Sequence, residues 1–299
     1  MTSGHQQSEG SVQVSWDIRD KVVLVTGGAS GIGLATATEL ARRGANVTIT
    51  SRSVDKATAA ANAINESTGA SVTGLGLDLS ELEKIDSFLE RYRQITDRVD
   101  VLINNAGTIS AKRQVTRDGF ELTLASNYIG PFYLTNQLIP LLSQTPASRI
   151  LNVSSELYRN VKGGLDLGNL QLEQGFSSSK AYANSKLALM LFTFELLQRH
   201  QDIDSFAIHP GVIRSNFGTA PESGLSMSLM MKLIGPMLKK PDHGARSSVL
   251  LATADIEELN SSWYWSEGLP ARPLSMAQDP RVSEKLWQLS EDLIRKARA

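Results

Sequence analysis

Hydrophobic and polar residues follow two patterns that alternate along this chain. Short, nearly continuous apolar runs rich in Val and Ile are typical of strands buried on both faces. Longer stretches with apolar residues at every third or fourth position are typical of helices with a buried face. Strands are predicted at residues 21–26, 46–51, 71–78, 99–104, 149–154 and 203–209, with a last short one at 263–265. Helices are predicted at residues 31–43, 54–68, 81–95, 118–142 and 179–200 and from 281 onward, with Pro131 near a kink or break of the fourth.

This β–α alternation determines the expected fold class. Strands joined through helices lie parallel, with right-handed crossovers and helices on both faces of the sheet. No linker divides the pattern, so residues 19–299 are predicted to form one α/β domain, a doubly wound parallel sheet of about seven strands. Residues 1–18 are predicted to form a disordered tail, because they are polar and lack the basic start and apolar run of a secretory signal.

Two segments are unusually apolar. The predicted helix at 179–200 is apolar nearly all round after Lys186, which leaves two alternatives open: packing inside the domain, or an interface between subunits. The chain is accordingly expected to be a monomer or a homodimer. Residues 225–238 are rich in Leu, Met and Ile, but they are too short to span a bilayer and are interrupted by Lys232, Gly235 and Pro236. No transmembrane segment is predicted, and peripheral membrane contact stays open.

The composition narrows the possible functions. The 299 residues are 41% hydrophobic and 20% charged, as in ordinary soluble globular proteins. A formal net charge of −1 gives no general attraction to nucleic acid, so no nucleic-acid partner is expected. The absence of cysteine excludes disulfides and thiolate catalysis, fits a reducing compartment and leads us to expect a cytoplasmic location. The four histidines show no metal-ligand spacing, so no metal site is predicted.

A glycine-rich turn follows the first predicted strand and leads directly into the first helix. Residues 26–33 read Thr-Gly-Gly-Ala-Ser-Gly-Ile-Gly. Glycines allow a tight turn and let backbone N–H groups approach a pyrophosphate, while the helix N-terminus supplies partial positive charge. The strand–turn–helix context is that of a Rossmann-type dinucleotide site. The residues assigned to this phosphate site are Gly27, Ser30, Gly31, Ile32 and Gly33.

The ends of the next strands indicate which dinucleotide fits. An acidic residue at the end of the second strand would bind the adenosine 2′-hydroxyl, but this chain has Arg52 there, which can clamp a 2′-phosphate. NADP(H) is therefore predicted in preference to NAD(H). Asp78, with Leu79 after it, closes the third strand and can accept a hydrogen bond from the adenine amine. The small residues that let the backbone pass close to the adenine ribose are Asn105, Ala106 and Gly107.

Tyr182 and Lys186 supply candidate proton chemistry. They lie four residues apart in the predicted helix at 179–200, so both side chains project from one face, one turn apart. A phenol has a pKa of about 10, and a fixed cation nearby is expected to lower it. The pair is thus a candidate general acid/base for an alcohol or carbonyl oxygen.

Together these residues resemble the short-chain dehydrogenase/reductase superfamily. The glycine turn, Asn104-Asn-Ala-Gly, a strand ending in Asn152-Val-Ser-Ser and the Tyr-x-x-x-Lys pair occur in that order, and the likeness extends from about residue 19 to the C-terminus. The closer likeness is to the retinol-dehydrogenase-like branch, which includes WW-domain oxidoreductases and protochlorophyllide reductases. It rests on Ser51-Arg52, on residues 208–215, and on the Trp263-Tyr-Trp and Leu286-Trp segments.

The resemblance implies a role for each matching residue. Tyr182 would exchange a proton with the substrate oxygen, and Lys186 would lower the pKa of Tyr182 and bind the nicotinamide ribose. Ser155 would hydrogen-bond the substrate carbonyl, and Asn127 would hold a water beside Lys186. Residues 156–179, an insert like that of the branch, are expected to form part of the substrate wall. The residues implied to line the nicotinamide side are Pro210, Gly211, Ile213 and Ser215, where the serine replaces the commoner threonine.

The function implied by the resemblance is an NADP(H)-dependent oxidoreductase. It would move a hydride between nicotinamide and a carbonyl, or a primary or secondary alcohol, of an apolar small molecule. A methionine-rich lid at 217–238 suggests a bulky, adaptable pocket for a retinoid-, steroid-, terpenoid- or polyketide-like substrate. The alternatives are a carbon–carbon double-bond reductase on the same scaffold and a catalytically silent NADP(H)-binding regulator. The presence of Asn127, Ser155, Tyr182 and Lys186 together favours chemistry.

Overall fold

The computed structural model of the chain describes residues 16–213, 239–259 and 262–299. Residues 1–15 of the expected tail, Ser215 and the expected lid at 217–238 lie outside the described residues. The following statements concern the described ranges.

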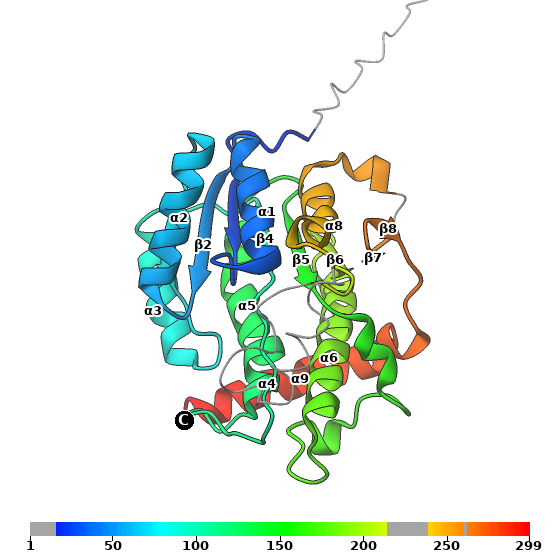
Figure 1. Cartoon of the computed structure of the whole chain (residues 1–299). Helices are drawn as coiled ribbons and strands as arrows, with labels where there is room; N and C mark the ends of the chain where they lie inside the picture. The colour runs from blue at the N-terminus through cyan, green and yellow to red at the C-terminus, as the bar shows by residue number, and fades with distance from the viewer. Residues whose placement is uncertain (1–15, 214–238, 260–261) are drawn as a thin grey trace, which may run out of the picture.

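A single sheet of eight strands forms the centre of the fold (Figure 1). Neighbouring strands are parallel except for the last pair, so the predicted doubly wound α/β architecture is confirmed. The strands are, in order across the sheet, β3 (Thr73–Gly76), β2 (Asn46–Ser51), β1 (Val22–Val25), β4 (Val101–Asn104), β5 (Arg149–Val153), β6 (Asp204–His209), β7 (Tyr264–Ser266) and β8 (Leu269–Pro270).

The eighth strand is a difference from the expected seven. β8 has two residues and pairs antiparallel with β7 through the turn at Glu267 and Gly268, both of which have positive φ values, 52° and 89°. Two successive residues in this conformation form the type of turn that hairpins prefer. A two-residue strand carries no side-chain period, so its sequence pattern could not reveal it.

Seven helices cover the two faces of the sheet, which is why the central strands are apolar on both sides. Along β1, Leu24 faces one hydrophobic core, whereas Val23 and Val25 face the other. The core on the Val23 side is closed by α1 (Gly31–Arg42), α2 (Val54–Thr68) and α8 (Pro241–Thr253). The core on the Leu24 side is closed by α3 (Leu82–Arg93), α5 (Gly130–Leu142), α6 (Ser178–Arg199) and α9 (Pro280–Ala297) (Figure 1).

The helix predicted at 118–142 is interrupted where Pro131 led us to expect a kink or break. A short α4 (Leu122–Leu124) begins after Glu121, whose carboxylate accepts from the backbone N–H groups of Thr123 and Leu124 at 3.0 and 2.8 Å. A π-helical segment, η1 (Ala125–Ile129), follows and leads into α5. Pro131 has no N–H to offer to the carbonyl of Asn127, so regular α-helical bonding cannot continue there.

The apolar surface of α6 is covered from within the chain. Trp287 of α9 packs against Phe132 and Phe192, with ring centroids 4.9 and 5.7 Å apart, and Ser283 donates to the carboxylate of Glu195 at 2.6 Å. Packing inside the domain therefore accounts for the apolar helix. Although α6 has 22 residues, no helix in the described ranges is long and apolar enough to cross a bilayer.

Residues at the end of the expected tail contact the folded domain. Ile18 is buried, and the indole N–H of Trp16 donates to the carbonyl of Ala252 in α8 at 2.8 Å. The guanidinium of the buried Arg149 lies 4.2 Å from the centre of the Trp16 ring. The folded body thus includes Trp16–Ile18, which the sequence analysis placed in the tail.

Candidate active site

The site residues predicted from the sequence lie along one edge of the sheet. Many of them directly follow the carboxyl end of a strand: Asp78 after β3, Arg52 after β2, the glycine turn after β1, Asn105 after β4 and Ser155 after β5. The strand order 3-2-1-4-5 therefore arranges the expected adenine, phosphate, ribose and catalytic residues in that sequence along the edge. Open α/β sheets bind ligands at this edge, where the strand order reverses between β1 and β4.

The glycine turn is held against the end of β4. Gly27 has φ of 66°, a left-handed conformation that a side chain disfavours. The hydroxyl of Thr26 accepts from the backbone N–H groups of Asn105 and Ala106 at 3.0 and 3.1 Å. The side-chain amide of Asn105 donates to the carbonyl of Thr26 at 2.9 Å. Thr26, which the sequence analysis gave no role, thus joins two predicted parts of the nucleotide site.

The turn has the form that a pyrophosphate requires. A Cβ at Gly33 would overlap the Asn105 amide and the Gly27 carbonyl, and one at Gly28 would lie 2.7 Å from Ile49. Gly33 therefore lets the N-terminus of α1 approach the turn, and Gly28 lets the turn approach β2. Ser30 is the N-cap of α1 without a side-chain capping bond, and the first turn holds no acidic residue. Backbone N–H groups at such a helix start suit an anion, so the residues present fit a dinucleotide.

The adenine end of the edge combines a cation with a second helix start. Arg52 is exposed at the end of β2, and Ser53 caps α2 by accepting from the N–H of Lys56 at 3.3 Å. The first turn of α2 also contains Asp55, which opposes an anion there. Asp78 accepts from the N–H and hydroxyl of Ser80 at 3.0 and 2.7 Å.

The four predicted catalytic residues converge at the ends of β4 and β5. Asn127, in the π-helical segment η1, donates to the hydroxyl of Ser185 at 3.0 Å and accepts from the N–H of Thr108 at 2.7 Å. The ammonium of Lys186 donates to the carbonyl of Val153 at 2.8 Å and lies 5.6 Å from the centre of the Tyr182 ring. A Cβ on Gly107 would be 3.4 Å from the side-chain amide oxygen of Asn127 and 3.6 Å from the Lys186 ammonium, so Gly107, Asn127 and Lys186 lie together.

Burial controls the proton affinities of the pair on α6. Lys186 is 3% exposed, and burial lowers its pKa to about 8. Burial raises the pKa of Tyr182 to about 12, while a hydrogen bond with Ser155 acts in the opposite direction. The net pKa of Tyr182 is therefore raised, because desolvation of the phenolate outweighs the hydrogen bond with Ser155. The expectation that Lys186 lowers this pKa stays a prediction. The phenol of Tyr182 remains protonated at neutral pH.

The remaining predicted cofactor residues follow β6. Pro210 is buried, and Gly211 has φ of 90° with Glu267 side-chain atoms 3.1 Å from where its Cβ would be. Ile213 is buried and forms an isolated parallel bridge with Lys239. These residues lie beside the end of β5 because β5 and β6 pair in parallel.

The insert at 156–179 begins beside the site and packs into the body. It contains the 3₁₀ helices η2 (Glu156–Asn160) and η3 (Leu167–Asn169). Tyr158 and Leu170 are buried in the core on the α6 side. Gln171 accepts from the N–H of Glu121 at 2.9 Å, which links the insert to the start of α4.

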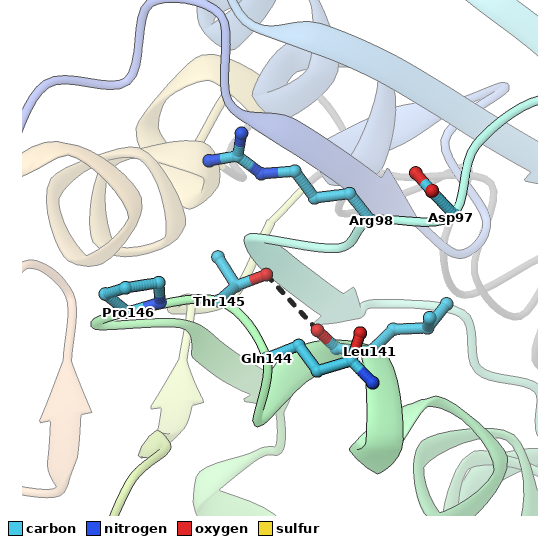
Figure 2. A pocket seen from close by; sticks show the side chains of 6 residues that line it. All are labelled: Asp97, Arg98, Leu141, Gln144, Thr145 and Pro146. Atoms are coloured by element: carbon cyan, nitrogen blue, oxygen red, sulfur yellow. Dashed lines mark hydrogen bonds between the residues drawn. The ribbon is translucent and has the colours of Figure 1, made fainter.

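Two surface hollows lie away from these residues. One of about 330 Å³ is lined by Asp97, Arg98, Leu141, Gln144, Thr145 and Pro146, next to the amino ends of β4 and β5 (Figure 2). The other, of about 290 Å³, lies between α3 and α5 near Arg298. Neither includes a predicted site residue, and the first lies at the edge of the sheet opposite the glycine turn.

Comparison with known proteins agrees with this geometry. The family model described as short chain dehydrogenase matches residues 21–224. Human retinol dehydrogenase 14 is 36% identical over 291 residues, covering 92% of this chain and 86% of the relative. Human retinol dehydrogenase 13 is 37% identical over 287 residues, covering 93% and 85%.

Solved structures agree on the fold. The crystal structure of an uncharacterised protein from Mycobacterium paratuberculosis has a TM-score of 0.72 and 30% identity, covering 94% of this chain and 96% of that one. L-sorbose reductase from Gluconobacter frateurii, complexed with NADPH and L-sorbose, has a TM-score of 0.67 at 22% identity, covering 87% and 100%. At that identity the likeness is one of fold alone.

Proposed function

Because the chain belongs to the short-chain dehydrogenase/reductase superfamily, within its retinol-dehydrogenase-like branch, we propose that it is an NADP(H)-dependent oxidoreductase acting on the carbonyl or alcohol group of a bulky apolar small molecule. The observation that carries the proposal is the convergence of Ser155, Tyr182 and Lys186 at the sheet edge that also holds the glycine turn. When bound, the nicotinamide dinucleotide supplies or accepts the hydride.

The side chains divide the proton chemistry between them. Tyr182 keeps its proton at neutral pH, so in the reductive direction it donates that proton to the carbonyl oxygen. Ser155 hydrogen-bonds to Tyr182 and orients the same oxygen. Lys186 places a buried positive charge beside the phenol, which favours the phenolate left after proton transfer. Asn127 connects η1 to α6 through Ser185 and keeps the Thr108 backbone in place.

Arg52 supports NADP(H) as the cofactor. It stands where an acidic residue would bind the 2′-hydroxyl of NAD(H), and its guanidinium at the N-terminus of α2 presents positive charge to a 2′-phosphate. The other residues that would hold the dinucleotide are the glycine turn, Asp78, Asn105 and the segment after β6, as predicted from the sequence.

The substrate class rests on the relatives and on the sequence. The names of the relatives indicate retinol, an apolar alcohol with a bulky ring and chain. We extend that to retinoid-, steroid-, terpenoid- or polyketide-like carbonyls and alcohols, because the segment at 217–238 is rich in methionine and leucine.

The test is NADPH oxidation with a panel of apolar aldehydes and ketones, using Tyr182→Phe as the matched variant. Removal of one hydroxyl should lower kcat by about 10²- to 10⁴-fold and leave the Kd for NADPH unchanged. Equal turnover by both proteins would remove Tyr182 from the mechanism. A rise in Tm with NADPH but no turnover by the wild type would indicate the silent regulator instead, and turnover of conjugated enones at the carbon–carbon bond would indicate the double-bond reductase.

A further inference from the structure

His209 connects the ends of three neighbouring strands at the catalytic edge. It is the last residue of β6 and is 7% exposed. Its Nδ1 accepts a hydrogen bond from the backbone N–H of Glu156 at 3.2 Å, just beyond the end of β5. Its backbone carbonyl accepts from the N–H of Glu267 at 2.9 Å, just beyond the end of β7. The bond to Glu156 requires a lone pair on Nδ1, so the imidazole is neutral with its proton on Nε2.

Glu156 is held at three points. Besides its backbone bond to His209, its carboxylate accepts from the hydroxyl of Tyr264 in β7 and from the guanidinium of Arg159 one turn later. Arg159 in turn donates to the carbonyl of Arg272 at 3.0 Å. Burial alone would raise the pKa of Glu156, but the bonds from Tyr264 and Arg159 outweigh it and hold the pKa below its ordinary value. The carboxylate is therefore charged at neutral pH. The bonds of Glu156 to His209, Tyr264 and Arg159 are called here the Glu156 brace.

This brace adjoins the hydroxyl that the proposed reaction needs. Ser155 directly precedes Glu156 and is the N-cap of η2, where its hydroxyl accepts from the N–H of Leu157 at 3.3 Å. The same hydroxyl hydrogen-bonds to Tyr182. The peptide unit between Ser155 and Glu156 carries the N–H that His209 holds. A shift of that peptide would therefore move the Ser155 hydroxyl relative to Tyr182.

We propose that His209 is a positioning residue for the proposed oxidoreductase reaction, which its unprotonated Nδ1 keeps active by fixing the peptide that carries Ser155. Protonation of Nδ1 would place two donors face to face, so the bond to Glu156 would break and the Ser155 hydroxyl would lose its place. The inference rests on the proposed function, and it predicts loss of turnover on the acid side through a residue that never touches substrate.

Four charged groups act on His209. Glu156 and Arg159 lie on η2, Glu267 lies on the β7–β8 turn, and Lys239 is paired with Glu267. The two carboxylates favour the imidazolium and the two cations oppose it, but burial is the largest influence and lowers the pKa of His209 below its ordinary 6.5. The neutral form is thus dominant at neutral pH, and the loss of activity should begin only below 6.5.

The test compares His209→Leu with His209→Asn, using purified full-length chain and the substrate found active in the panel. Leucine removes the acceptor, whereas asparagine places a carbonyl oxygen where Nδ1 was and cannot titrate. We expect His209→Leu to lower kcat/KM by about 10- to 100-fold near neutral pH, because a misplacement of about 1 Å is sufficient. We expect His209→Asn to restore most of that loss and to abolish the acid limb that the wild type shows.

Each outcome decides between the two proposals. A wild type without turnover removes the proposed function and the role of His209 with it. A wild type with turnover, beside a His209→Leu variant of equal kcat/KM, overturns the role of His209 alone. An acid limb that persists unchanged in His209→Asn also overturns it, and this result can be read even where the leucine variant fails to fold. Tm measured at each pH separates loss of position from loss of fold.

Discussion

Lys186 provides the sharpest quantitative test of the site, because its burial has a calculable consequence for stability. The ammonium is 3% exposed and donates to the carbonyl of Val153 at 2.8 Å. Burial lowers the pKa of the group from an ordinary 10.5 to about 8. The gap corresponds to roughly 3 kcal/mol, since one pKa unit equals about 1.36 kcal/mol. That free energy is what the folded protein loses by keeping this amine charged in a desolvated place.

The sign of the pH dependence follows from linkage. The pKa is lower in the folded chain than in the unfolded chain, so between about 8 and 10.5 the unfolded chain holds a proton that the folded chain has released. The free energy of unfolding therefore rises with pH across this window. Below about 8 both states are charged and the full penalty applies.

The assay is denaturant unfolding of the wild type and of Lys186→Met across that pH window. Other groups titrate alike in the two proteins, so their difference isolates Lys186. The free energy of unfolding of the wild type, relative to that of the variant, should increase by roughly 3 kcal/mol between about pH 8 and 10.5. A difference that stays flat would refute the assignment of a desolvated ammonium. Because the charged form of Lys186 favours the phenolate left by proton transfer, kcat/KM for carbonyl reduction should fall as the pH rises through about 8 and Lys186 loses its proton.

Three further predictions address the cofactor and the core. Arg52→Asp should raise the Kd for NADPH at least about tenfold more than that for NADH. Arg295→Asp on α9 is the control charge reversal, and an unchanged ratio of the two Kd values in Arg52→Asp would contradict the NADP(H) assignment. Gly33→Ala should weaken dinucleotide binding by about tenfold or more, measured by titration, whereas Gly69→Ala, where nothing lies within 4 Å, should lower stability only; equal affinities would contradict the close approach. Trp287→Ala should reduce the free energy of unfolding by about 3–5 kcal/mol, and a loss under about 1 kcal/mol would show that α9 adds little to the α6 core.

The fold was predictable wherever large apolar side chains carry the pattern. The strands β1, β4 and β5 are buried on both faces, so their runs of Val, Ile and Leu are unmistakable. Helix α8 was missed, because its buried residues are mostly small or polar, including Gly244, Ala245, Ser247 and Ser248. Gly244 packs so closely that a Cβ there would lie 2.8 Å from Ile213 and 2.9 Å from Ile32. Close packing by small residues leaves no hydrophobic period for sequence reasoning to detect.

The site was predictable in its residue types but not in its supporting contacts. Spacing brought Tyr182 and Lys186 into the prediction, and the family resemblance added Asn127 and Ser155; the structure places all four together. Thr26 and His209 were not assigned a role, although both belong to motif segments, because their contacts run to residues far along the chain. Only strand order makes those pairs neighbours, and strand order is a property of the whole sheet.

The net rise in the pKa of Tyr182 was not predictable for the same reason. Spacing along one helix sets the distance between a phenol and an ammonium, so it leads to the Coulombic expectation that the cation lowers the pKa. Desolvation depends instead on what surrounds the pair, and here the surroundings include Val153 from β5, Gly107 from the loop after β4 and Asn127 from the π-helical segment. These segments are distant in sequence, so their joint effect cannot be inferred from a four-residue motif. The result is a phenol that holds its proton and an amine that holds its proton less firmly, which suits delivery of a proton to a carbonyl oxygen near neutral pH.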